Sequence, residues 1–168
     1  LVPCDDNSHG THTMGTMVGD DGAGNQIGVA PGAKWIAARG CEARTCSSET
    51  LLAAGQFITA PTDLNGANPR PELRPDIVNN SWGGEVHDEW YRDVVRAWET
   101  AGIMPVFAAG NEGERGCNSV GSPADYEESY VVGAYDIDNN LAEFSSRGNG
   151  KPDIAAPGVN VRSSIPGG

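Results

Sequence analysis

The chain has 168 residues and a formal net charge of −12, and its only lysines are Lys34 and Lys151. So acidic a chain is poorly suited to phosphate contacts, so we expect no nucleic-acid partner and no binding to anionic membranes. It contains no run of about 18 apolar residues, so no segment is expected to span a membrane. The length is sufficient for one domain with its own core.

The segment 6–19 is predicted to contain the first helix. Asn7 and Ser8 are favourable N-cap residues, which would place His9 in the first turn, at the edge of a cleft. Gly10 and Gly15 each lower helix propensity by about 1 kcal/mol relative to Ala, which suggests a close approach of another backbone. An isolated histidine is usually a capping or core residue, so its position alone does not give His9 a role.

The next segment, 19–26, has the composition of a loop and contains Asp20 and Asp21. Its glycines follow a helix rather than open one, so it is not a dinucleotide-binding fingerprint. Carboxylate and carbonyl oxygens could bind calcium here, and an ordinary loop is the alternative interpretation.

The remaining pattern alternates strands and helices. Strands are expected at 34–39, 76–81, 103–109, 130–135 and 153–156, and helices from Ser47 to near Pro61 and from His87 to Ala101. The helix from His87 to Ala101 has an apolar face, formed by Trp90, Val94, Val95, Trp98 and Ala101. This alternation predicts an α/β fold with a mostly parallel sheet and helices on both faces. Ligands of such sheets bind at the strand carboxyl ends, so the segments 81–84 and 110–111 should share a rim.

The four cysteines are Cys4, Cys41, Cys46 and Cys117. Cys41 and Cys46 flank a short polar loop and are predicted to form a local disulfide, and Cys4 could pair with Cys117, although the sequence does not choose among the pairings. Disulfides would indicate an oxidising, extracellular setting. A zinc or structural site using His9, His12 and the cysteines is the competing interpretation, but no C-x-x-C pair supports it.

Several motifs occur in an order that resembles the subtilisin-like serine proteases (subtilases). These are H-G-T-H at 9–12, S-W-G-G at 81–84, A-A-G-N-E-G at 108–113, F-S-S at 144–146 and A-A-P-G at 155–158. The tract 35–63 and the S-W-G-G region look most like secreted bacterial subtilases of the bacillopeptidase F type. The resemblance implies a subtilisin-like three-layer α/β/α fold, a polypeptide substrate and a secreted enzyme.

The resemblance also implies residue roles. His9 would be the general base, His12 a packing residue and Asn111 the side-chain donor to the oxyanion. Substrate-binding positions would be Ser81, Trp82, Gly83, Ala109, Gly110 and Gly121. Gly121 suggests a pocket with room for a large side chain, and Glu112 either favours basic residues or is simply solvated. No cofactor is needed for the chemistry, and subtilases often carry a structural calcium on the loop that corresponds to 19–26.

The sequence departs from the family pattern in two places. It has neither a D-T-G-like strand end before the histidine nor a G-T-S-M-A-like motif for the nucleophile. We therefore expect residues 1–168 to be the central part of one subtilase catalytic domain, inactive alone and completed by the remainder of that domain. The alternative is a non-catalytic subtilisin-fold module that binds peptides along 81–84.

Overall fold

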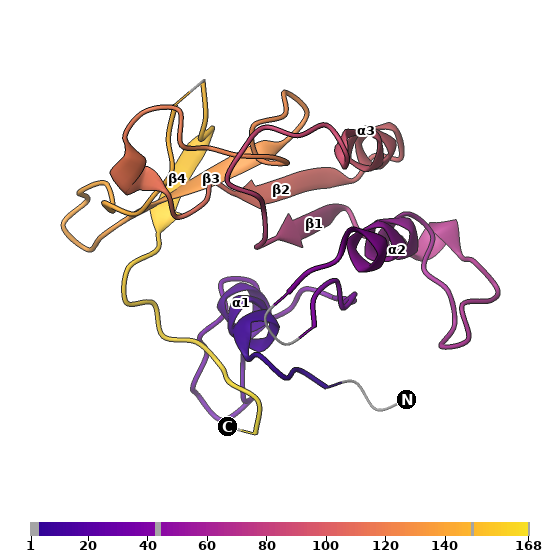
Figure 1. Cartoon of the computed structure of the whole chain (residues 1–168). Coiled ribbons are helices and arrows are strands. Elements are labelled where there is room, and N and C mark those ends of the chain that lie inside the picture. Colours follow the sequence, from indigo (N-terminus) through magenta and orange to yellow (C-terminus); the bar gives the residue numbers. More distant parts are fainter. Residues whose placement is uncertain (1–3, 43–44, 149, 168) are drawn as a thin grey trace.

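The computed structural model describes residues 4–42, 45–148 and 150–167, and four parallel strands form its centre (Figure 1). The strands are β1 (Ile77–Asn80), β2 (Met104–Ala108), β3 (Tyr130–Tyr135) and β4 (Ile154–Pro157), hydrogen-bonded in the order β1-β2-β3-β4. The helices are α1 (His9–Val18), α2 (Ser48–Thr59) and α3 (Arg92–Thr100), with short 3-10 turns at Pro71–Leu73 and Gly113–Arg115. The predicted parallel α/β architecture is confirmed.

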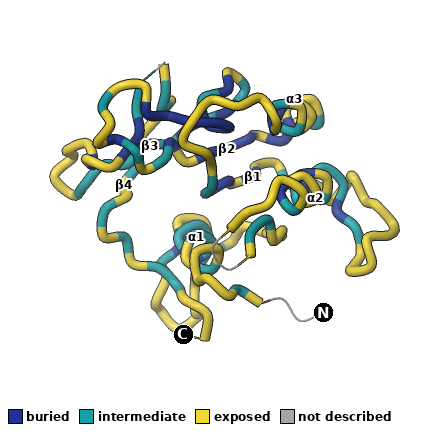
Figure 2. Tube along the Cα trace, viewed as in Figure 1, coloured by how far each residue is buried: buried dark blue, intermediate teal, exposed yellow. Residues whose placement is uncertain are grey.

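The two faces of the sheet differ in burial. Val78, Phe107 and Val131 point into the core, and the last two are fully buried. Ile77 and Met104 alternate with the core positions along their strands, and Ile154 lies on the edge strand β4. All three are exposed. Figure 2 shows the buried residues gathered around the strands and α3, whereas the lower part of the molecule, which contains α1, is mostly exposed. One face is therefore covered in the described residues and the other is open, which agrees with a sheet that is incomplete in this chain.

The core lies where α2 and α3 meet the covered face. Trp98 donates its indole N–H to the carbonyl of Gly55 (3.1 Å), and the Tyr91 hydroxyl donates to the carbonyl of Leu51 (3.0 Å). A Cβ atom on Gly55 would lie 2.6 Å from Val94, so this glycine permits the close approach of the two helices. Burial of a large apolar side chain contributes about 1.5–3 kcal/mol, so Tyr91 and Trp98, each 1% exposed, stabilise this interface.

The limits of α2 follow the sequence, but those of α3 do not. The Ser47 hydroxyl accepts the amide of Thr50 (3.1 Å), and the helix ends at Thr59, ahead of Pro61. The prediction that a helix begins at His87 is wrong, because α3 begins at Arg92. The amide of Asp88 donates to the Ser122 hydroxyl (2.7 Å), so a tertiary contact holds this stretch outside the helix.

The predicted strand at 34–39 is also wrong. This segment is irregular, and Trp35 is 61% exposed and Ile36 38% exposed. A parallel strand needs a hydrogen-bonded neighbour and cover on its faces. In the described structure the edge strand β1 pairs with β2, and 34–39 does not join the sheet. Its apolar composition alone is therefore not enough to make a strand.

The start of α1 differs from the expected capping. Ser8 occupies the N-cap position with φ 73° and makes no side-chain cap bond. The carboxylate of Asp5 instead accepts the amides of Asn7 (3.1 Å), Ser8 (2.9 Å) and Thr11 (2.8 Å). Farther along the helix, a Cβ atom on Gly15 would lie 2.1 Å from the hydroxyl oxygen of Ser164. The expected close approach at Gly15 is confirmed.

The cysteines give one confirmed and one wrong pairing. Cys41 and Cys46 form a disulfide with Cα atoms 4.0 Å apart. Cys4 and Cys117 are free and exposed, so the suggested pairing between them is wrong. Among the residues described, no helix is long and apolar enough to cross a membrane.

Candidate active site

The carboxyl ends of β1 and β2 form one rim of the sheet. Asn80, the last residue of β1, pairs with Phe107, so Ser81 and Ala108 leave the strands side by side. Both residues line a shallow groove on the open face, together with Val132 of β3 and Pro157 of β4. Parallel strands thus bring the segments 81–84 and 110–111 to one edge, as their order along the chain predicts.

Asn111 lies in a turn that is fixed from behind. Gly110 has φ +104°, a conformation that favours glycine, and its carbonyl accepts the amide of Ser146 (3.1 Å). The amide of Asn111 donates to Glu112 (2.8 Å), and the amide of Glu112 donates to the Ser146 hydroxyl (2.9 Å). The turn is held through its backbone while Asn111 remains exposed. An exposed carboxamide on a fixed turn is free to donate to a bound group.

Glu112 has a role within this turn. Besides the Asn111 amide, its carboxylate accepts the hydroxyl of Ser146 at 3.1 Å, and Ser146 is fully buried. These bonds direct the carboxylate into the protein. The structure therefore favours neither suggested interpretation of Glu112, as a selector of basic residues or as a simply solvated carboxylate.

The segment after β1 forms a wall with residues 119–123. Trp82 is half-buried and packs edge-on against Tyr91 (4.9 Å between ring centroids) and Phe107 (5.8 Å). Gly83 is exposed, and the amide of Gly84 donates to the carbonyl of Ser122 (2.8 Å). Trp82 therefore anchors the wall in the core while Gly83 leaves backbone accessible.

Gly121 belongs to this wall and lies against residues 84–86. It is buried, and a Cβ atom there would lie 2.3 Å from the carbonyl oxygen of Gly84. The backbone of 84–86 thus occupies the space beside Gly121. In this structure the glycine allows two backbones to touch, and the suggested room for a large side chain is not found beside it. Ala109 is likewise buried behind the rim, where its amide donates to the carbonyl of Val132 (3.0 Å).

His9 is exposed at the first position of α1, and α1 is fastened to the segment that leaves β4. Ser163 donates its hydroxyl to the carbonyl of His12 (2.6 Å), and Ser164 donates to that of Thr11 (3.0 Å). Figure 1 shows the chain running from β4 down to α1. The side chain of His12 is exposed, so its expected packing role is wrong. The convergence of His9 and Asn111 on one carbonyl stays a prediction.

Asp5 and Ser122 help to position this site and were not singled out from the sequence, whereas Ser146 belongs to the F-S-S motif. Asp5 accepts the hydroxyl of Thr11 (2.6 Å) as well as three amides. The Thr11 hydroxyl and amide, more than the other donors, hold the pKa of the Asp5 carboxyl far below its usual range. Ser146 and Ser122 secure the two rim segments. The D-x-x-S-H spacing was the only signal for Asp5, since an acid four residues before a helix start can cap it.

The 19–26 loop, for which a structural calcium is one possibility and an ordinary loop the other, uses its carboxylates in local hydrogen bonds. Asp20 accepts the amide of Gly22 (2.9 Å), and Asp21 accepts those of Ala23 (2.8 Å) and Asn25 (3.0 Å). The side-chain oxygen of Asn25 accepts a hydrogen bond from the guanidinium of Arg162 (2.6 Å), and calcium binding by this loop stays a prediction. Across the described ranges, no three His, Cys, Asp or Glu side chains gather as a metal site.

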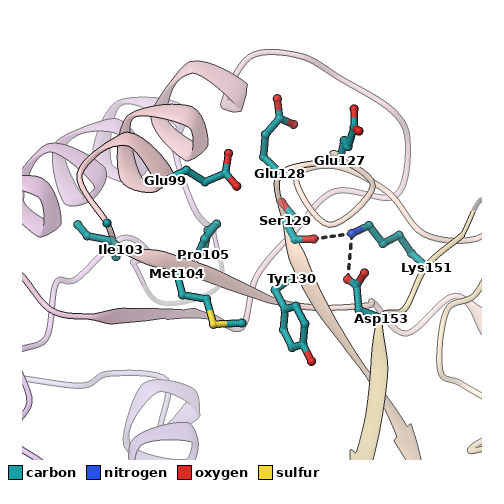
Figure 3. A pocket seen from close by; sticks show the side chains of 11 residues that line it. Glu99, Ile103, Met104, Pro105, Glu127, Glu128, Ser129, Tyr130, Lys151 and Asp153 are labelled. Atoms are coloured by element: carbon teal, nitrogen blue, oxygen red, sulfur yellow. Dashed lines mark hydrogen bonds and ion pairs between the residues drawn. The ribbon is translucent and has the colours of Figure 1, made fainter.

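A second hollow lies at the opposite, amino edge of the sheet. Figure 3 shows Glu99, Met104, Tyr130 and Lys151 around it. The ammonium group of Lys151 bonds the carbonyl of Ser129 and the carboxylate of Asp153 (2.9 Å), so its charge is compensated. None of the predicted site residues lines this hollow.

Comparison with known proteins identifies the family. A model of the subtilase family, peptidase S8, matches residues 3–167. The chain is 52% identical to bacillopeptidase F of Bacillus subtilis over 98% of its own length, and 35% identical to subtilisin E of the same species over 98%. It is 33% identical over 96% to the major intracellular serine protease of that species. The chain spans only 12%, 40% and 48% of these three relatives. On this match over almost its whole length, the chain belongs to the subtilase family.

Proposed function

We propose that this chain is part of a serine endopeptidase, with His9 as general base and Asn111 as oxyanion donor. The observation that carries the proposal is the family match over residues 3–167, which includes H-G-T-H at 9–12 and A-A-G-N at 108–111. The exposed Asn111 on a fixed turn at a strand carboxyl end is consistent with it.

The chemistry would divide between these two side chains. As a serine oxygen bonds to the peptide carbonyl carbon, the imidazole of His9 takes the hydroxyl proton and then gives it to the leaving amine. The Asn111 carboxamide donates to the carbonyl oxygen while that oxygen carries negative charge. These steps need only side-chain proton transfer and hydrogen bonding, so we propose no cofactor for the chemistry.

We propose that the serine and the orienting aspartate come from the remainder of the same catalytic domain. The sequence contains neither family motif for them, and the chain spans 40% of subtilisin E. The open face of the sheet, with exposed Ile77, Met104 and Ile154, supports the view that further chain packs there.

A polypeptide is the proposed substrate. An extended peptide can add as a strand to exposed backbone, which gains main-chain hydrogen bonds without demanding particular side chains. We propose Gly83 and Gly110 as the backbone that it meets, with Ser81 and Trp82 lining the wall and Ala109 and Gly121 supporting it from behind. Gly83 is exposed, and Ser81 lines the groove.

We also propose a secreted, extracellular protein. The Cys41–Cys46 disulfide supports an oxidising setting. The similar proteins do not decide the matter, since one of them is named an intracellular protease.

The test is hydrolysis of a peptide ester by the complete protein. Asn111→Ala should lower kcat by about 10²- to 10³-fold, the range known from a subtilisin. His9→Ala should abolish base-dependent turnover, with His12→Ala as the matched control. The 168-residue chain alone should show no activity that His9→Ala removes. Peptide binding by the complete protein without any hydrolysis would support the non-catalytic module instead.

A further inference from the structure

His87 lies between two carboxylates close to the substrate wall. Its Nδ1 is 2.7 Å from Oδ2 of Asp125, and its Nε2 is 3.0 Å from Oε1 of Glu89. A neutral imidazole has one N–H and one lone pair, whereas an imidazolium has two N–H donors. Two carboxylate oxygens can therefore both accept from this ring only when it is protonated.

Asp125 joins this ion pair to the wall. The side chain of Asp125 is 10% exposed, and its second oxygen accepts the Ser122 hydroxyl at 2.7 Å. That hydroxyl also accepts the amide of Asp88 (2.7 Å). The buried carboxylate of Asp125 thus links His87, which is 38 residues away from it along the chain, to Ser122, which is three residues away.

The same two segments are paired through their backbones beside the proposed substrate positions. The amide of Gly84 donates to the carbonyl of Ser122 (2.8 Å), and the amide of Ser122 donates to the carbonyl of Val86 (3.1 Å). Gly121 fits against the carbonyl of Gly84 with no room for a Cβ atom. The wall formed by the segment after β1 and residues 119–123 therefore continues to residues 88 and 125, and the His87–Asp125 contact lies at its far end.

We propose that His87 is a positioning residue that closes this wall when it is protonated, so that the backbone at Gly83 is held in place for a peptide only in the closed state. This inference rests on the proposed function, since it gives the wall a substrate to hold. His87 does not touch the reacting atoms, and it acts through Asp125 and Ser122.

The direction of the pH dependence follows from the groups around the ring. The hydrogen bond and charge of Asp125 raise the pKa of His87 above its usual 6.5, burial acts against them less strongly, and Glu89 adds a smaller upward effect. Arg92 of α3 also binds Glu89, with its Nη1 2.9 Å from the same Oε1 that His87 contacts. A raised pKa means that the contact is fully formed below 6.5 and is lost as the pH rises through the shifted value.

The first measurement is independent of protease activity. In the complete protein, NMR titration of His87 should show a lower pKa in Asp125→Asn than in the wild type, with His12 on α1 as the internal reference. The protection factor of the Gly84 amide, which is its solvent exchange corrected for the intrinsic rate at each pH, should be lower above the His87 pKa than below it, and His87→Arg should remove that difference. A His87 titration unaltered by Asp125→Asn, or an equal Gly84 protection factor on both sides of the His87 pKa, overturns the proposal.

The second measurement reads peptide binding without chemistry. With His9→Ala in every variant, the Kd for an extended peptide should rise about two- to five-fold from about pH 5.5 to about pH 9, the change that an exposed ion pair supports. His87→Arg, with a permanent charge, should keep the tighter Kd at both values, and His87→Gln should give the weaker Kd at both. Equal Kd values for the Arg and Gln variants contradict the proposal.

The two hypotheses fail in different ways. If the complete protein does not hydrolyse peptides but binds them with the His87 pattern, the endopeptidase proposal fails and the positioning role stands. If it hydrolyses peptides while the Kd of the wild type is independent of pH and equal to that of His87→Gln, the positioning role fails alone.

Discussion

Two tryptophans lie in two regions of this protein that differ in how far the chain itself buries its side chains. Trp98 lies on α3, is 1% exposed and donates to the Gly55 carbonyl (3.1 Å). Trp35 lies in an irregular segment and is 61% exposed. We call the first region the packed side, made of α2, α3, residues 111–129 and the covered sheet face. The second is the open side, made of residues 4–40 and the exposed sheet face.

The difference shows that an apolar run becomes a stable element only where a complementary surface exists. Both tryptophans occur in stretches whose composition predicts burial. On the packed side, α2 offers Gly55 as a surface into which α3 fits. On the open side, the described chain offers the 34–39 segment no neighbouring strand. Burial, rather than local propensity, separates the two outcomes.

Truncating the two tryptophans should give the largest contrast. Trp98→Ala should lower the free energy of unfolding of this chain by about 3–5 kcal/mol, because it removes a filled core position and leaves a cavity. Trp35→Ala should change it by less than about 0.5 kcal/mol, as for an exposed side chain. Urea unfolding followed by circular dichroism measures both. Similar losses for the two variants would show that the open side is packed as tightly as the other.

The sequence predicts the packed side well because its signals are local. The Ser47 cap, Pro61, the buried positions Val95 and Trp98 on α3 and the four strands of the sheet all occur as expected. The late start of α3 was not predictable, because it depends on a bond from Asp88 to Ser122, 34 residues away. No sequence pattern around His87 predicts a contact that only the fold creates.

In the candidate site, too, the sequence predicts some of the residues and not others. Motif positions place Asn111 at a strand end without any knowledge of its contacts. The residues that hold its turn, Glu112 and the buried Ser146, come together from 34 residues apart. Asp5 was not predicted because Asn7 and Ser8 are good capping types closer to the helix, and only the backbone geometry shows that Asp5 accepts the amides instead. The sequence thus identifies the residues that carry chemistry better than it identifies the residues that hold them in position.

A second pair of variants tests how the open side is attached. In α1, Gly15→Ala should destabilise the chain by about 1–3 kcal/mol, because its Cβ atom would lie 2.1 Å from Ser164 and 2.5 Å from Ser163. Gly10→Ala meets only Asp5 at 3.7 Å, so it should stabilise α1 by up to about 1 kcal/mol through helix propensity. Thermal unfolding of both variants measures the difference. If Gly15→Ala is as stable as Gly10→Ala, α1 does not pack on 163–164 in solution.

The smallest expected effect is on stability at acid pH, and it depends on a charged residue of the packed side. On the packed side, burial raises the pKa of Glu128, but hydrogen bonds from Arg92 and then Arg96 outweigh it and hold the pKa at about 2, below the ordinary 4.5. Glu128 accepts from Arg92 at 3.0 Å and from Arg96 at 2.6 Å, which ties residues 121–129 to α3. A depressed pKa means that this stabilisation is present above 4.5 and is lost as the pH falls toward 2.

Glu128→Gln should therefore be less stable than the wild type near neutral pH, and the two proteins should converge as the pH falls from 4.5 to about 2. Glu127→Gln, an exposed neighbour, is the matched control and should follow the wild type. Urea midpoints at several pH values measure the convergence. If the gap between Glu128→Gln and wild type stays constant through this range, the arginines do not hold a charged Glu128. The acid sensitivity of the protein would then have to arise at other carboxylates with lowered pKa values, such as Asp5, which caps α1, or Asp153.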